Sequence, residues 1–164
     1  MNKMLYGTMN NTEAFYFLEM AYSFSLVKLR NVINWCQGIV EKEEIPPDWS
    51  LEILAMGDSA DYRDVFRFLR YELSENIDHE NINANFFALC LKKAEEGAID
   101  LGFIFNKLIY DGNEYHLNED VIRIIKPLEI YFSEDGWDKI KATEDSLSFL
   151  EIYRELLPNV EAII

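Results

Sequence analysis

The 164-residue chain has few of the residues that interrupt helices or build chemical sites: seven glycines, four prolines, two cysteines and two histidines. Scarce glycine and proline favour regular elements joined by short loops. The chain also has no signal-peptide pattern and no membrane-length apolar run, because Glu13 and Glu19 interrupt its first hydrophobic segment. We therefore expect a soluble protein of the cytoplasm.

The cysteines and histidines do not form a recognisable chemical site. Cys36 and Cys90 stand within apolar helical patterns, so buried free thiols are favoured over a disulfide. His79 and His116 lie in polar segments with no second ligand at helical spacing, and residues 78–81 lack the glycine of a calcium loop. We predict no metal and no cofactor.

Nucleophilic and phosphate-binding motifs are also missing. The chain has no Gly-x-Ser-x-Gly motif and no glycine-rich phosphate loop. Neither cysteine neighbourhood offers a cationic group or a turn that would lower the pKa of the thiol. We therefore predict that the protein has no catalytic residue and is not an enzyme. A substrate site assembled from scattered carboxylates is the alternative.

Positive charge is scarce as well. The chain has 30 acids and 15 bases, which gives a net charge of -15, and both halves share the excess. Such a field repels nucleic acid phosphates and anionic membranes. It attracts a basic protein surface. Either recognition of such a partner or simple solubility explains the charge.

Hydrophobic residues form 49% of the chain and recur at steps of three and four, which indicates a folded, helical protein. We predict an all-α fold, an irregular single-domain bundle of about seven or eight helices spanning residues 1–164. The segment Leu128–Phe132, after Pro127, remains ambiguous between helix and strand. Predicted helix-starting residues are Asn11 or Thr12, Ser25, Pro47, Asp58 or Ser59, Asn83, Asn118, Ser133 and Thr143. Predicted ends are Gly57, Gly97 and Pro158.

Three acidic clusters are candidates for partner binding: Glu41, Glu43 and Glu44; Asp58, Asp61 and Asp64; and Glu134, Asp135 and Asp138. Each also has a structural interpretation, which we favour. The first cluster ends a helix before a rigid loop in which Trp49 packs inward. The second caps a helix and complements its dipole. In the third, Phe132 and Trp137 are spaced as a hydrophobic staple.

Residues 25–58 resemble a group of small, acidic bacterial proteins. The features are Val32-Ile33-Asn34-Trp35, an acidic helix exit, Pro46-Pro47-Asp48-Trp49, and a short helix ended by Gly57-Asp58. Some members of this group resemble the immunity proteins of bacterial toxin systems. The resemblance implies a bacterial, cytoplasmic setting and binding of a cognate toxin. It assigns no functional residue.

The leading functional hypothesis is therefore an acidic inhibitor that binds a basic protein partner, such as a nuclease-type toxin, and covers its active site. An acidic surface can mimic the phosphates that a nuclease holds, and it accelerates association. The alternative is a cytoplasmic adaptor or regulatory domain that holds another protein.

Overall fold

The computed structural model describes residues 6–57, 59–133 and 137–164, with only the backbone for residues 129–133 and 137–139. The chain is 71% helical, and no strand occurs among the described residues, which confirms the all-α prediction. Within the same residues there are nine α-helices and one 3-10 helix, slightly more than the predicted seven or eight. No described helix has the length and apolar character needed to cross a membrane.

Helix α5 (His79–Glu95) is the centre of the structure, and every residue from 81 to 91 is buried. Helix α1 (Asn11–Ser23) packs against it, as do α8 (Trp137–Glu151), the 3-10 helix η1 (Arg154–Leu156) and α9 (Leu157–Glu161). The core between them is rich in aromatic rings. The largest fully buried side chains include Phe15, Phe17, Phe86, Phe87 and Phe105.

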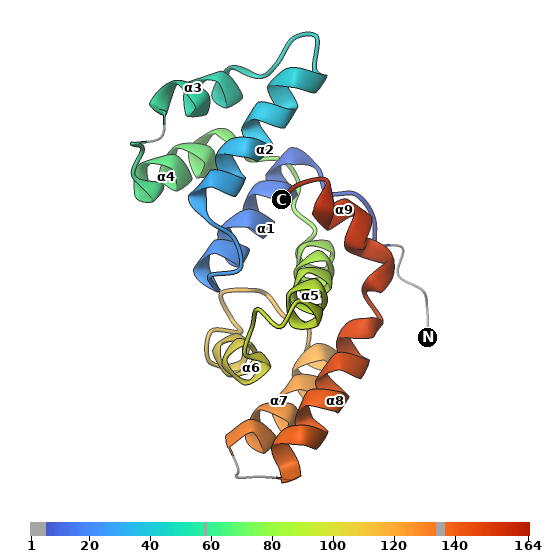
Figure 1. The fold of residues 1–164 in the computed structure, drawn as a ribbon. Coiled ribbons are helices and arrows are strands. Elements are labelled where there is room, and N and C mark those ends of the chain that lie inside the picture. Colours follow the sequence, from blue (N-terminus) through green and yellow to red (C-terminus); the bar gives the residue numbers. More distant parts are fainter. Residues whose placement is uncertain (1–5, 58, 134–136) are drawn as a thin grey trace.

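Two groups of helices extend from this centre in opposite directions (Figure 1). At one end, α2 (Leu29–Lys42) packs against α3 (Asp48–Met56), and α3 contacts α4 (Tyr62–Glu72). At the other end, α6 (Leu101–Tyr110) packs against α7 (Glu119–Ser133), which packs against α8. The connection between α2 and α3 lies at the far end of the first group.

Several helix starts differ from the predictions. Asn10 caps α1 in a reciprocal capping box with Glu13, in place of Asn11 or Thr12. Asp61 caps α4 through the backbone N–H of Arg63, in place of Asp58 or Ser59. These segments contain several cap-forming residues in succession, and the turn of the preceding loop decides which one reaches the free N–H groups.

Two predicted starts lie in other structures. Ser25 adopts a left-handed conformation (φ 60°) in the α1–α2 turn, so α2 begins later, at Leu29. Asn83 is buried inside α5, whose cap is Asp78. The buried face of α2 consists of Val32, Trp35, Cys36 and Ile39. The apolar side chains of Leu29, Ile33 and Val40 are only half-buried.

Proline positions also differ from expectation. Pro47 is the N-cap of α3 rather than its first residue. Pro127 lies inside α7, and the backbone of residues 128–132 is helical. Pro158 is the second residue of α9 instead of ending the preceding helix. Proline is tolerated in the first turn, because the N–H groups there have no partner within the helix. Pro127, inside α7, instead removes one hydrogen bond of that helix and crowds the carbonyl four residues earlier.

Other predicted boundaries have a mixed outcome. Thr143 lies in the middle of α8, so it is not a cap, and Ser133 is the last residue of α7. Asn118 does cap α7, because its Oδ1 accepts the N–H of Val121 at 2.8 Å. Gly57 and Gly97 follow the ends of α3 and α5 with φ of 72° and 68°, a backbone conformation that glycine adopts without strain. Both glycine predictions are confirmed.

Candidate functional site

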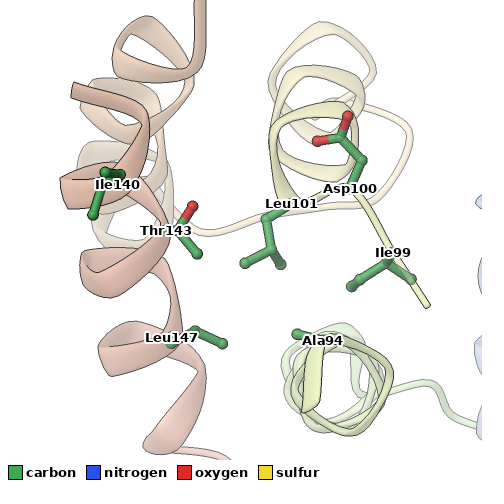
Figure 2. Close-up of a pocket in the computed structure, with 7 residues that line it drawn as sticks. All are labelled: Ala94, Ile99, Asp100, Leu101, Ile140, Thr143 and Leu147. Atoms are coloured by element: carbon green, nitrogen blue, oxygen red, sulfur yellow. The ribbon is translucent and has the colours of Figure 1, made fainter. Parts of the chain in front are cut away.

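An apolar groove of about 380 Å3 lies where the end of α5 and the start of α6 face α8 (Figure 2). On α8 its wall consists of Ile140, Thr143 and Leu147, and Leu101 faces them from α6. Asp100 stands at the rim, where its Oδ1 caps α6 by accepting the N–H groups of residues 102 and 103. The groove has an apolar floor and one carboxylate, a combination suited to an apolar side chain rather than to chemistry.

A second groove, of about 270 Å3, is lined mainly by polar and aromatic side chains. It lies between α1, the start of α5 and the connection from α6 to α7, residues 111–118. The lining residues that carry polar groups or rings are Tyr16, Glu19, Ser23, His79, Asn83, Glu114, Tyr115 and His116. Convergent groups of this kind are typical of a ligand site.

The two histidines meet at this second groove. Their ring centroids are 4.0 Å apart with an interplanar angle of 27°, so the imidazoles are stacked. His116 reaches this position with a positive φ of 51°, which is uncommon for a residue with a side chain. Burial lowers the pKa of His79, and the positive charge of His116 lowers it further. At neutral pH the pair therefore favours an uncharged His79.

The connection that carries His116 is held in place by Tyr115. The side-chain amide of Asn83 donates a hydrogen bond to the carbonyl of Tyr115 (2.9 Å). The hydroxyl of Tyr115 lies 3.3 Å from that of Ser23, and its ring packs against Phe24. These contacts tie the α6–α7 connection to both α1 and α5.

The first predicted acidic cluster is open to solvent. Glu41, Glu43 and Glu44 are all exposed, and Glu41 accepts a hydrogen bond from the Gln37 amide at 2.8 Å. Trp49 stacks on Trp35 with ring centroids 5.5 Å apart and is half-buried, as expected of an inward-packing residue. Beside these acids Ile45 is 86% exposed.

The second cluster has structural roles. Asp61 caps α4, and Asp64 pairs with Arg67 at 2.7 Å. The structural interpretation therefore explains both residues. Asp58 lies outside the described residues.

The third cluster cannot be placed in the same way. Glu134 and Asp135 lie outside the described residues, and so do the side chains of Asp138, Phe132 and Trp137.

Several of the described cations make ion pairs within the protein. Lys92 and Lys93 pair with Glu96, and Lys92 also reaches Glu161. Arg154 joins Glu95 to Glu151. The remaining pairs include Arg70 with Glu19, and Arg123 with Glu119 and Asp120.

Neither thiol is set up for reaction. Cys36 and Cys90 are buried and free, as predicted. Burial raises the pKa of Cys36 to about 12 and raises that of Cys90 as well. Both thiols remain protonated at neutral pH, so they serve the core.

Metal-ligand geometry is not found in the described part of the chain, where no group of three or more His, Cys, Asp or Glu side chains is arranged to hold an ion. The histidine pair was not predicted, because its members are far apart in sequence and no local pattern joins them. Comparison of the chain with protein-family models, with curated proteins and with solved structures found no match.

Proposed function

We propose that this protein binds a basic protein partner and neutralises it. In its more specific form, the proposal is a cytoplasmic, bacterial immunity-type protein that covers the active site of a nuclease-type toxin. A nuclease needs cations around its cleft to hold phosphates. An acidic surface placed over that cleft replaces the phosphates and excludes the substrate.

The segment that supports this proposal is residues 41–52. It comprises the last two residues of α2, the α2–α3 connection and the first part of α3. Residues 41–52 contain five acids and one lysine. All five acids are exposed, and within the described part of the chain none of them makes an ion pair: Glu41, Glu43, Glu44, Asp48 and Glu52. Their charge is therefore available to a partner, and Ile45 offers an apolar contact among them.

Charge reversal at this connection tests the proposal. The first variant combines Glu41→Lys, Glu43→Lys and Glu44→Lys. The matched control combines Glu144→Lys, Asp145→Lys and Glu155→Lys, which changes the net charge equally at exposed positions of α8 and η1. Asp61 is unsuitable for this purpose, because reversing it also removes the cap of α4.

Association rates are then measured with the basic products of the adjoining genes as candidate partners, at about 50 and about 300 mM salt. We expect the first variant to associate at least about tenfold more slowly than the control, because surface charges steer encounter. Equal slowing in both variants would show that the net charge of the protein, and not a local interface at residues 41–52, sets the association rate. Salt-independent association that both variants leave unchanged would overturn the proposal.

An adaptor function is the second candidate, and the groove in Figure 2 favours it. Ile140 is 63% exposed at the edge of that groove, where an apolar side chain of a partner could cover it. The substitution Ile140→Asp would then abolish binding while the charge reversals had little effect. The opposite pattern would favour the neutralising function.

A further inference from the structure

The groove that contains the histidine pair has the composition of a cation site. It lies at the C-terminal end of α1, where the helix dipole is negative and where the last turn contains no basic residue. The phenol rings of Tyr16 and Tyr115 and the imidazoles of His79 and His116 give it aromatic walls. Aromatic faces and a helix C-terminus both attract cations.

Two carboxylates line the groove: Glu19 of α1 and Glu114 of the α6–α7 connection. Asp78 and Asp111 also lie close enough to act electrostatically on His79 and on Tyr115, respectively. Burial raises the pKa of Tyr115 first, and the charges of Asp111, Glu114 and Glu19 raise it further. The ring of Tyr115, which lines the groove, therefore lies in a locally negative field.

Two cations of the protein lie close to the groove, and both have partners. Arg70 of α4 binds Glu19. Lys107 of α6 donates a hydrogen bond to the carbonyl of Ser23 at 2.7 Å and lies 4.8 Å from the ring centroid of Phe24. Lys107 shows that this end of α1 accepts a cation held by a carbonyl and a ring. In the described part of the chain, Asp111 and Glu114 remain without an ion pair.

We infer that this groove binds a guanidinium group, the side chain of an arginine presented by the basic partner. A guanidinium is planar, so it can lie against a ring while its N–H groups reach a carboxylate such as Glu114. A lysine ammonium lacks the flat face and is more strongly hydrated. This inference rests on the proposed function, because it names the residue by which the partner would be anchored.

The stacked imidazoles argue against a metal as the ligand. Histidine binds a metal through a nitrogen lone pair that lies in the plane of its ring. With planes only 27° apart and centroids separated by 4.0 Å, the lone pairs of the two rings lie in nearly parallel planes. They therefore do not converge on one ion as the ligands of a tetrahedral site do.

The same pair makes the site sensitive to pH. A guanidinium is favoured beside neutral imidazoles and repelled by imidazolium. Protonation of His79, whose pKa is lowered chiefly by burial, would therefore weaken binding as the pH falls towards that lowered value. A loss of affinity between pH 8 and about 5.5 is the expected sign of this protonation.

The test uses the whole protein and two small probes, N-acetyl-arginine amide and its uncharged analogue N-acetyl-citrulline amide. The imidazole C–H resonances of His79 and His116 are followed by NMR during titration at pH 8. We expect the arginine probe to shift both resonances in a saturable manner, and the citrulline probe to bind at least about tenfold more weakly.

Two charge variants locate the effect: Glu114→Gln at the groove, and Glu52→Gln on α3 as the matched control. Glu114→Gln should weaken the arginine probe about threefold to fivefold, the range of an exposed ion pair, and Glu52→Gln should leave it unchanged.

Equal shifts with both probes, or no shift with either, would overturn the inference. Equal weakening by the two variants would also overturn it, because the effect would then come from the overall charge. The outcome is separable from that of the proposed function. If the partner associates in a salt-dependent manner while the arginine probe does not bind, the inference fails and the function stands. If the probe binds while basic partners do not, the function fails and the groove remains a guanidinium site.

Discussion

Two acidic regions of the chain have different electrostatic surroundings. The first region is residues 41–52, at the α2–α3 connection. The second lies where α5 contacts α8, η1 and α9. Near that contact Arg154, Lys92 and Lys93 bind the neighbouring carboxylates. In residues 41–52 the five acids have one lysine among them and make no ion pair with any described residue. Net charge alone therefore does not identify a recognition surface. The arrangement of the counter-charges is what distinguishes the two regions.

The largest expected effect comes from removing a buried side chain of α4, the helix that lies with α2 and α3 at one end of the molecule (Figure 1). Leu69 of α4 is fully buried, and Phe66 on the same helix packs against Phe15 and Tyr22 of α1. We expect Leu69→Ala to lower the free energy of unfolding by about 2 to 5 kcal/mol, because it leaves a cavity in the core. Denaturant titration measures this loss.

The control for this change is Tyr71→Ala on the same helix. Tyr71 is 84% exposed, so its truncation should alter the free energy of unfolding by about 0.5 kcal/mol at most. A loss below about 1 kcal/mol for Leu69→Ala would contradict the packing of α4 against α1.

The helices were predictable because their signal is local. Apolar residues recur at steps of three and four along α4, where Val65, Phe66 and Leu69 are buried but Tyr62, at its start, is exposed. Helix α5 was less clear, since nearly all its faces are buried and its polar residues Asn83 and Asn85 lie inside the protein. A helix that is buried on nearly all sides has no polar face that would identify it in the sequence. A polar residue inside such a helix, such as Asn83, is therefore easily mistaken for the cap at its start.

The candidate site was harder to predict, for two reasons. In the sequence, Asp61 and Asp64 form a cluster of acids at a helix end, as the acids of residues 41–44 do. The conformation of the loop before α4 is what makes Asp61 a cap. The contact of His79 with His116 depends on the positive φ of His116 and on the path of the α6–α7 connection. Neither property has a local signal in the sequence.

A smaller effect is expected from breaking the ion pairs of the second region. The substitution Arg154→Gln removes the bridge between Glu95 and Glu151. We expect a small loss of stability, well below that of Leu69→Ala, because the pair is exposed and salt screens it. Hydrogen bonds from Arg154 hold the pKa of Glu151 below its ordinary value of 4.5. This contribution is therefore present at neutral pH and is lost as the pH falls below that value.

The matched change in the first region is the double substitution Glu43→Gln and Glu44→Gln. Because these acids have no cationic partner among the described residues, we expect no loss of stability and a slight gain from reduced repulsion. Denaturant titrations of both variants at low and high salt measure the difference. An equal loss of stability in Arg154→Gln and in the double variant would contradict the difference between the two acidic regions that the ion pairs indicate.

The smallest expected effect concerns the histidine pair, at the start of α5 and in the α6–α7 connection. Burial and then the charge of His116 lower the pKa of His79 below its ordinary value of 6.5. The unfolded chain therefore takes up a proton at His79 at a higher pH than the folded protein does. Stability from this group is present above about pH 6.5 and decreases as the pH falls towards the lowered value. Denaturant titrations at pH 8 and at about pH 5.5 should show a smaller decrease in His79→Gln than in the unaltered protein. An identical decrease in both proteins would mean that the stacked pair does not oppose protonation, and would remove the pH dependence expected of the guanidinium groove.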